Sequence, residues 1–170
     1  MFLKIISIIG SLTFLSRLLG YSRDLLVALI FGASYVSDAF FVSFKLPNLF
    51  RRLFAEGAMN SAFIPVVSGI KERSGNDKAI YFLNEVFSIL FSALLPFIIV
   101  IELFMPIIIL FVAPGFEQGS SKFNLTVYLS RLSFPFLLFV CLSSLIGGYL
   151  NTMSKFAAMA FTPVILNLSM

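Results

Sequence analysis

The chain has 170 residues, of which 59% are hydrophobic and only 12% are charged, whereas about 25% of residues are charged in average soluble domains. Its mean hydropathy of +1.03 indicates an integral membrane protein and excludes an ordinary soluble domain. The net charge is +4, but the twelve basic residues are scattered among apolar runs, so a nucleic-acid-binding patch is excluded. With one cysteine and no histidine, the sequence offers no internal disulfide and no zinc or haem site. That cysteine, Cys141, lies in an apolar run and is expected to be a small buried residue.

Five apolar segments follow one another along the chain, separated by short joints that carry Gly, Pro, Asn or Ser, residues typical of turns. Because lipid offers no hydrogen-bond partner to an open sheet edge or an irregular loop, each segment is expected to be helical. The expected spans are residues 2–31, 36–70, 79–112, 123–150 and 156–170. The sequence therefore predicts an all-α integral membrane protein built as a multi-span helix bundle.

The first segment starts with a basic residue and an apolar run, as a signal peptide does, but no small-x-small cleavage site follows it. We therefore expect a retained first helix. A basic residue, Lys4, lies at the start of this helix, and basic residues recur in the joint at residues 71–78, whereas the joint after the third segment holds only Lys122. Because Lys and Arg accumulate in cytoplasmic loops, this pattern favours a cytoplasmic N-terminus.

The fifth segment is short: it has 15 residues, whereas a complete span needs roughly 20. Pro163 would bend even this short helix. The 170 residues are therefore expected to be the N-terminal part of a longer, transporter-sized membrane domain, with the fifth span truncated.

Charged side chains lie within the first two apolar segments, where each costs about 2.5 to 3.5 kcal/mol on insertion scales. Such groups normally face a protein interior or a water-filled cavity. In the first segment Arg17 and Asp24 are seven residues apart, which at about 100° per residue places them on one helix face, with Arg23 about a third of a turn away.

The second segment carries four charged residues, separated by seven, seven and four positions, that share one narrow stripe of a helix: Asp38, Lys45, Arg52 and Glu56. Arg51 falls on a different face, about 100° from Arg52. Pro47 removes a backbone hydrogen bond and predicts a kink at the level of these charges.

Residues 17–56 hold five basic and three acidic side chains, a surplus of two positive charges that internal pairing cannot neutralise. Arginines that face a cavity suit an anionic ligand, because the planar guanidinium donates paired hydrogen bonds that match phosphate oxygens. The acids would keep the arginines oriented. A second interpretation stays open: Arg17 and Arg23 snorkel to the interface, and Arg51 with Arg52 marks a membrane boundary before an amphipathic surface segment.

Three further charges in the apolar segments have no assigned site. Glu85 is expected at the membrane interface, near the start of the third segment. Glu102 fits a proton or cation site and the outer interface equally well. Arg131 is similarly undecided, because it follows Lys122 by little more than two helical turns.

Four motifs stand out: SRLLGYSRD (16–24), SDAFFVSFKLPNLFRRLFAEGAMNSAFIPVV (37–67), APGF (113–116) and KFNLTVYLSRLSFPF (122–136). Together with GGYLNT and FTPVILN they resemble the MurJ/MviN family of bacterial lipid II flippases, and the resemblance covers essentially the whole chain. It implies a 14-helix, MATE-like transporter of the multidrug/oligosaccharidyl-lipid/polysaccharide exporter superfamily. Such a protein moves lipid II between the leaflets of the bacterial cytoplasmic (inner) membrane by alternating access.

The resemblance also implies a binding site. Arg17, Arg23 and Arg51 match family arginines that line a central cationic cavity for the pyrophosphate and sugar head group. Four further residues match positions on or beside that cavity: Asp24, Asp38, Arg52 and Glu56. Another family arginine, the groove for the lipid tail and a sodium site belong to helices that would follow residue 170. Glu102 matches no part of the family signature.

The expected function is therefore lipid II translocation for peptidoglycan biosynthesis, cell-wall biogenesis and cell shape. No nucleophile–base pair, metal-ligand cluster or Walker-type glycine loop occurs in the sequence, so neither an enzyme nor a cofactor is expected. Expected partners are lipid II and membrane lipids, with cell-wall synthesis proteins as further candidates. Two alternatives stay open: a related exporter of another polyprenyl-pyrophosphate glycan or of a cation, and a truncated membrane scaffold without transport.

Overall fold

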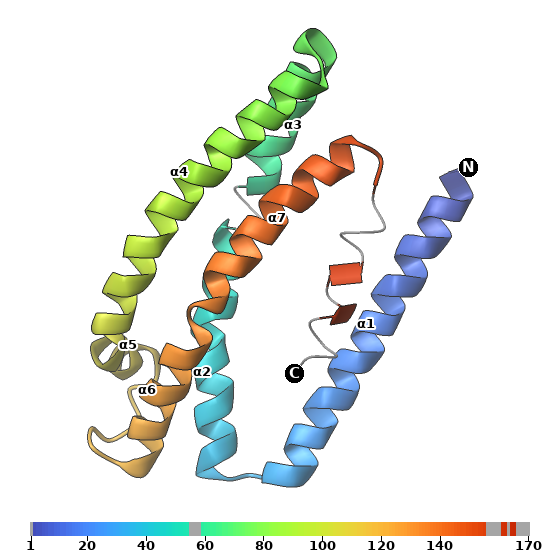
Figure 1. The fold of residues 1–170 in the computed structure, drawn as a ribbon. Coiled ribbons are helices and arrows are strands. Elements are labelled where there is room, and N and C mark those ends of the chain that lie inside the picture. The colour runs from blue at the N-terminus through green and yellow to red at the C-terminus, as the bar shows by residue number, and fades with distance from the viewer. Residues whose placement is uncertain (1, 55–58, 156–160, 163, 166–170) are drawn as a thin grey trace.

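The structure, a computed structural model, describes the whole chain except residues 1, 55–58, 156–160, 163 and 166–170 (Figure 1). The described residues form seven main helices: α1 (Phe2–Phe31), α2 (Tyr35–Arg51), α3 (Met59–Ser74), α4 (Asn76–Leu103), α5 (Met105–Val112), α6 (Ser121–Ser133) and α7 (Phe136–Thr152). None of the described residues lies in a β-strand. The predicted all-α class is therefore confirmed.

Local sequence explains where α1 ends and where α2 and α6 begin. Gly32, with a φ of 56°, makes the turn after α1, a conformation that glycine adopts without a steric penalty. Ser34 caps α2 by accepting a hydrogen bond from Ser37 N (3.3 Å), and Ser120 caps α6 by accepting one from Phe123 N (3.2 Å). Each cap satisfies a backbone N–H that the start of a helix leaves without a partner.

Three of the expected apolar segments are each divided into two helices. The segment 36–70 becomes α2 and α3, with a π-helical turn at residues 52–54 directly after α2. The segment 79–112 breaks at Phe104, just before Pro106, and the segment 123–150 breaks at residues 134–135, which include a proline. Because proline cannot donate to the preceding turn and its ring crowds that turn, it accounts for the second and third breaks.

Two stretches of the described residues are long and apolar enough to cross a membrane: Asn76–Leu103, which is α4, and Ser121–Thr152, which combines α6 and α7. The division of the chain into five spans stays a prediction, and most of the fifth segment, Pro163 included, lies outside the described residues. The kink at Pro47 also stays a prediction. The helix α2 continues through Pro47, and regular α-helical geometry ends only after Arg51.

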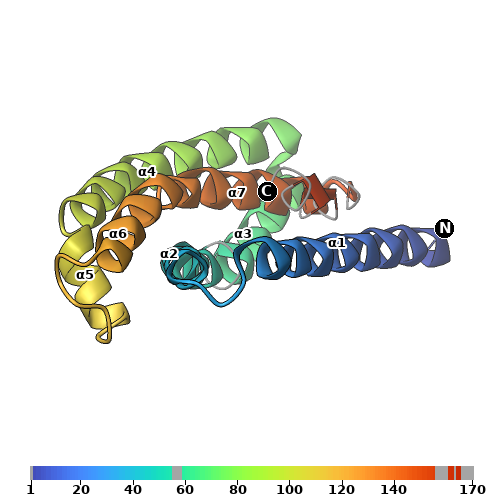
Figure 2. The same ribbon diagram turned by 90° about the horizontal axis from the view of Figure 1, so that it is seen from below.

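The helices are arranged in two rows. Seen from below, α4 and α7 run side by side with α5 and α6 at one end, and α1, α2 and α3 form the other row (Figure 2). The main contact of α2 is with α6, whereas α3 packs on both α4 and α7. The helix α1 meets α2 at their shared turn and diverges from it towards the N-terminus (Figure 1).

Apolar side chains from five helices form the larger core. Its buried members come from α2, α4, α5, α6, the break after α6, and α7: Leu46, Leu94, Ile98, Met105, Ile109, Phe123, Val127, Phe134, Leu137 and Cys141. The ring of Phe50 packs against those of Phe97 and Phe134, with centroids 5.4 and 5.8 Å apart. Cys141 is fully buried in this core, as its apolar surroundings in the sequence predict.

Small buried side chains occur on both α2 and α6, and each of these two helices has the other as its main neighbour. Four of them have no exposed surface: Ala39, Ser43, Thr126 and Ser130. Small residues allow membrane helices to approach closely. Ser43 Oγ donates to Phe40 O and Thr126 Oγ1 to Lys122 O, both at 2.7 Å, so these two hydroxyl groups are satisfied within their own helices. The two helices therefore form a close pair.

The molecule has two distinct ends (Figure 1). The N-terminus, the turn between α3 and α4 and the end of α7 lie at one end, called here the N-terminal end. The turn between α1 and α2 and the connection between α5 and α6 lie at the other, called the α5–α6 end.

Candidate functional site

The helix α1 carries three of the expected cavity residues. The Arg23 guanidinium donates to one oxygen of Asp24, from Nε at 3.1 Å and from Nη2 at 2.9 Å. The side chain of Arg23 is 28% exposed and that of Asp24 is 59% exposed, and Arg17 is exposed further towards the N-terminus. The acid next to Arg23 therefore orients its guanidinium group.

The end of α2 carries the other expected arginines. Arg51 is half-buried, and its Nε donates to Asn48 Oδ1 at 3.4 Å. Arg52 is exposed at the start of the π-helical turn. The two arginines therefore differ in surroundings, as their predicted separation around the helix indicates. Glu56 lies outside the described residues.

Asp38, at the start of α2, has a partner far along the chain. Its Oδ2 forms an ion pair with Lys122 Nζ at 2.5 Å, between residues 84 positions apart. The same Nζ lies 4.2 Å from the centroid of the Phe116 ring. Lys45, the next charge on the predicted stripe, is exposed. Asp38 thus contacts α6 through Lys122, which in turn contacts the α5–α6 connection at Phe116.

The described ion pairs join Arg23 to Asp24 within α1, and Asp38 to Lys122 between α2 and α6. The helices α1 and α2 are close at their shared turn and diverge beyond it (Figure 1). The charges of α1 and Arg51 therefore lie on two diverging helices. A single cavity that gathers all the predicted residues stays a prediction.

Lys122 is the residue that reasoning from the sequence missed as a partner of Asp38. One local signal was available. Lys122 lies in the first turn of α6, where the positive end of the helix dipole disfavours a cation. A residue that breaks such a local preference is often compensated by a tertiary contact.

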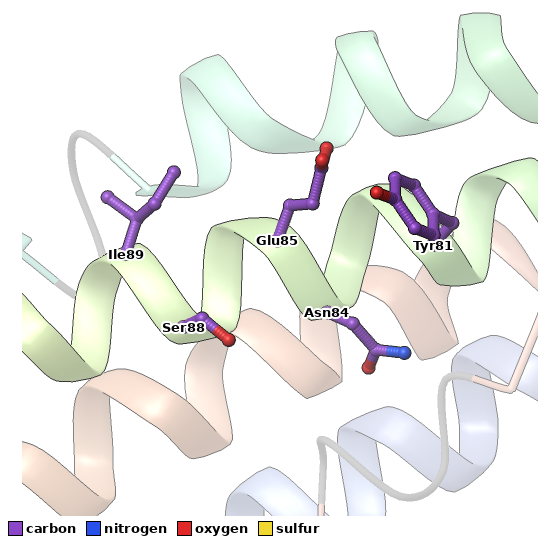
Figure 3. A pocket seen from close by; sticks show the side chains of 5 residues that line it. All are labelled: Tyr81, Asn84, Glu85, Ser88 and Ile89. Atoms are coloured by element: carbon purple, nitrogen blue, oxygen red, sulfur yellow. The ribbon is translucent and has the colours of Figure 1, made fainter.

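A shallow hollow of about 520 Å³ lies along α4 (Figure 3). It is lined by five side chains of that helix: Tyr81, Asn84, Glu85, Ser88 and Ile89. Glu85 is exposed, and none of the described residues that line the hollow is basic, so this lining does not suit an anionic ligand. In the described part of the chain, no group of three or more His, Cys, Asp or Glu residues could hold a metal ion.

Comparison with known proteins identifies the family. The family model described as "Lipid II flippase MurJ" matches residues 27–170. Two relatives named "Probable lipid II flippase MurJ", from Rickettsia prowazekii (strain Madrid E) and Rhizobium tropici, are 44% and 45% identical to the chain over 163 residues. These matches cover 94% and 95% of this chain but 31% of each relative. The chain therefore spans about a third of the length of these relatives.

A solved structure gives the same result. "Lipid II flippase MurJ, inward closed conformation" is similar with a TM-score of 0.78 and 34% sequence identity, over 94% of this chain and 33% of that one. The sequence match and the shared fold thus extend over nearly all of the residues. The chain belongs to the MurJ family of lipid II flippases.

Proposed function

We propose that the chain is the N-terminal part of a flippase that moves lipid II from the inner to the outer leaflet of the bacterial cytoplasmic membrane for peptidoglycan synthesis. The observation that carries this proposal is the family match over residues 27–170, which relatives named as lipid II flippases support. Alternating access requires binding and a conformational change but no covalent step. The protein therefore acts as a transporter and not as an enzyme.

The proposed site is a cationic cavity for the pyrophosphate of the lipid-linked precursor. Arg17, Arg23 and Arg51 would bind phosphate oxygens through charge-assisted hydrogen bonds, which are stronger where water is partly excluded. The ion pair between Asp24 and Arg23 supports this proposal, because it fixes a guanidinium group. Arg52 and Glu56 are proposed to lie beside the cavity.

The N-terminus is proposed to face the cytoplasm. Lys71, Arg73 and Lys78 lie around the turn between α3 and α4, Lys155 follows α7 and Lys4 lies at the start of α1, so five basic residues gather at the N-terminal end (Figure 1). The connections at the α5–α6 end, residues 32–34 and 113–120, contain no Lys or Arg, and Lys122 is the one basic residue in the first turn of α6 that follows. Because basic residues accumulate on the cytoplasmic side, this distribution supports the proposed orientation.

Replacement of the arginines tests the cavity. In the intact protein, expressed in bacteria depleted of their own lipid II flippase, Arg23→Ala and Arg51→Ala are expected to abolish the restoration of growth, because each removes a phosphate-binding group. Arg23→Lys keeps the charge but loses the paired donors, so we expect partial restoration. The matched control is Arg73→Ala, which removes an exposed arginine outside the cavity and is expected to restore growth fully.

Immunoblots of the membrane fraction establish that each variant is inserted. Normal growth with inserted Arg23→Ala and Arg51→Ala would contradict the cavity, whereas failure of the unaltered protein to restore growth would contradict lipid II transport. Binding of lipid II to the purified protein separates the alternatives. We expect another pyrophosphate-linked lipid to compete with lipid II for binding. Displacement of lipid II by organic cations would favour a cation exporter.

A further inference from the structure

The first turn of α6 holds a positive charge where helix electrostatics disfavour one. Lys122 is the second residue of α6, directly after Ser121, and no acidic residue lies in the same turn. The free N–H groups of a helix start create a positive potential, so a lysine there needs compensation from elsewhere.

That compensation comes from two other parts of the chain. Asp38, in the first turn of α2, forms the ion pair with Lys122, and the Phe116 ring lies within the range of a cation–π interaction with the same Nζ. Asp38 is also well placed for its own helix, because an acid in the first turn interacts favourably with the dipole. Lys122 thus joins α2, α6 and the α5–α6 connection.

These contacts lie at one end of the closely packed α2–α6 pair. Further along, Ala39 and Ser43 of α2 and Thr126 of α6 are fully buried, and the main contact of α2 is with α6. Arg51 and Arg52 lie at the opposite end of α2. A shift of α2 along α6 would therefore displace both arginines.

We propose that Asp38, Lys122 and Phe116 form a clamp that holds α2 in register with α6, and that Lys122 is a positioning residue for Arg51 and Arg52. Asp38 then binds Lys122 and does not contact the ligand. The clamp predicts that α2 and α6 move as one body during transport. This functional consequence rests on the proposed lipid II transport, whereas the clamp itself does not.

Charge exchange tests the functional role in the intact protein. Asp38→Asn and Lys122→Met each remove the ion pair, and Asp38→Lys combined with Lys122→Asp restores it with reversed polarity. We expect growth of flippase-depleted bacteria to fall with each single variant and to recover with the double variant and with Lys122→Arg. A direct role of Asp38 in the cavity predicts instead that Lys122→Met is silent and that the exchange does not restore growth; that result would overturn the proposal.

Hydrogen exchange of the purified protein tests the clamp without relying on transport. Within the α5–α6 connection, Phe116 N donates to Ala113 O and Ser120 N donates to Glu117 O. Loss of the clamp is expected to speed exchange of these two amides about two- to five-fold, the range expected for one exposed ion pair, and the exchanged pair should slow it again.

The control for hydrogen exchange is Glu117→Gln, which changes an exposed acid of the same connection and is expected to leave the rates unaltered. Unaltered rates in Lys122→Met would overturn the clamp. If the unaltered protein fails to restore growth, only the proposed function is contradicted, and the exchange rates still decide whether the clamp exists.

Discussion

Two basic side chains cap the ends of neighbouring helices. Arg131 Nε donates to Glu102 O, near the end of α4, at 3.2 Å, and Lys71 Nζ donates to Thr152 O, at the end of α7, at 2.7 Å. The last carbonyl groups of a helix lack partners within it and form the negative end of its dipole. Arg131, whose role the sequence leaves undecided, therefore acts as a cap, and Glu102 takes part through its backbone.

Removal of the Arg131 cap is expected to destabilise the protein. Arg131→Met keeps a long side chain but loses the guanidinium, and we expect the free energy of unfolding to fall by about 1 kcal/mol. Denaturant unfolding of the purified protein in detergent measures this change. Lys78→Met, which removes an exposed cation from the start of α4, is the control and should not reduce stability. Equal stability of Arg131→Met and the unaltered protein would exclude the cap.

At the scale of elements, the close approach of α2 and α6 depends on their small residues. Ser43 is fully buried in this contact, so Ser43→Leu would overpack it and is expected to cost about 1 to 3 kcal/mol of unfolding free energy. Ser92→Leu makes the same change at an exposed position of α4 and is expected to have little effect. The comparison is made by thermal unfolding, and similar losses for both variants would argue against close packing at Ser43.

Hydropathy predicted the apolar segments better than their internal breaks. The first segment, residues 2–31, has the same bounds as α1, and the predicted joints at residues 32–34 and 113–122 contain turns and helix caps. A break inside an apolar run leaves mean hydropathy unchanged, so the divisions at Phe104 and at residues 134–135 were not predicted, although prolines lie beside or within both.

At the scale of the whole molecule, the positions of the two ends allow a topology experiment. Ser74→Cys places a thiol at the N-terminal end, and Gln118→Cys places one at the α5–α6 end. A membrane-impermeant maleimide is expected to label Gln118→Cys in cells whose cytoplasmic membrane is intact, and Ser74→Cys only after that membrane is permeabilised. The unaltered protein is the control, because Cys141 is fully buried. The reverse labelling pattern would contradict a cytoplasmic N-terminus.

The candidate site was predictable only in part. Helical spacing indicated that Arg51 and Arg52 differ in surroundings, and the structure places Arg51 half-buried and Arg52 exposed. Spacing also placed Asp38 on a charged stripe, but it carried no information about Lys122. Periodicity reports the face of one helix, whereas the identity of the neighbouring helix depends on packing across the whole chain.

The sequence by itself determined the apolar composition, the all-α class, the main turns and the membership of the MurJ family, because these depend on local preferences and on motifs read along the chain. Only the tertiary structure decided which distant groups meet. The pairs Asp38–Lys122, Arg131–Glu102 and Lys71–Thr152 are 84, 29 and 81 positions apart. Each forms where helix packing places a cation beside an acid or a helix end, a condition set by the arrangement of neighbouring helices.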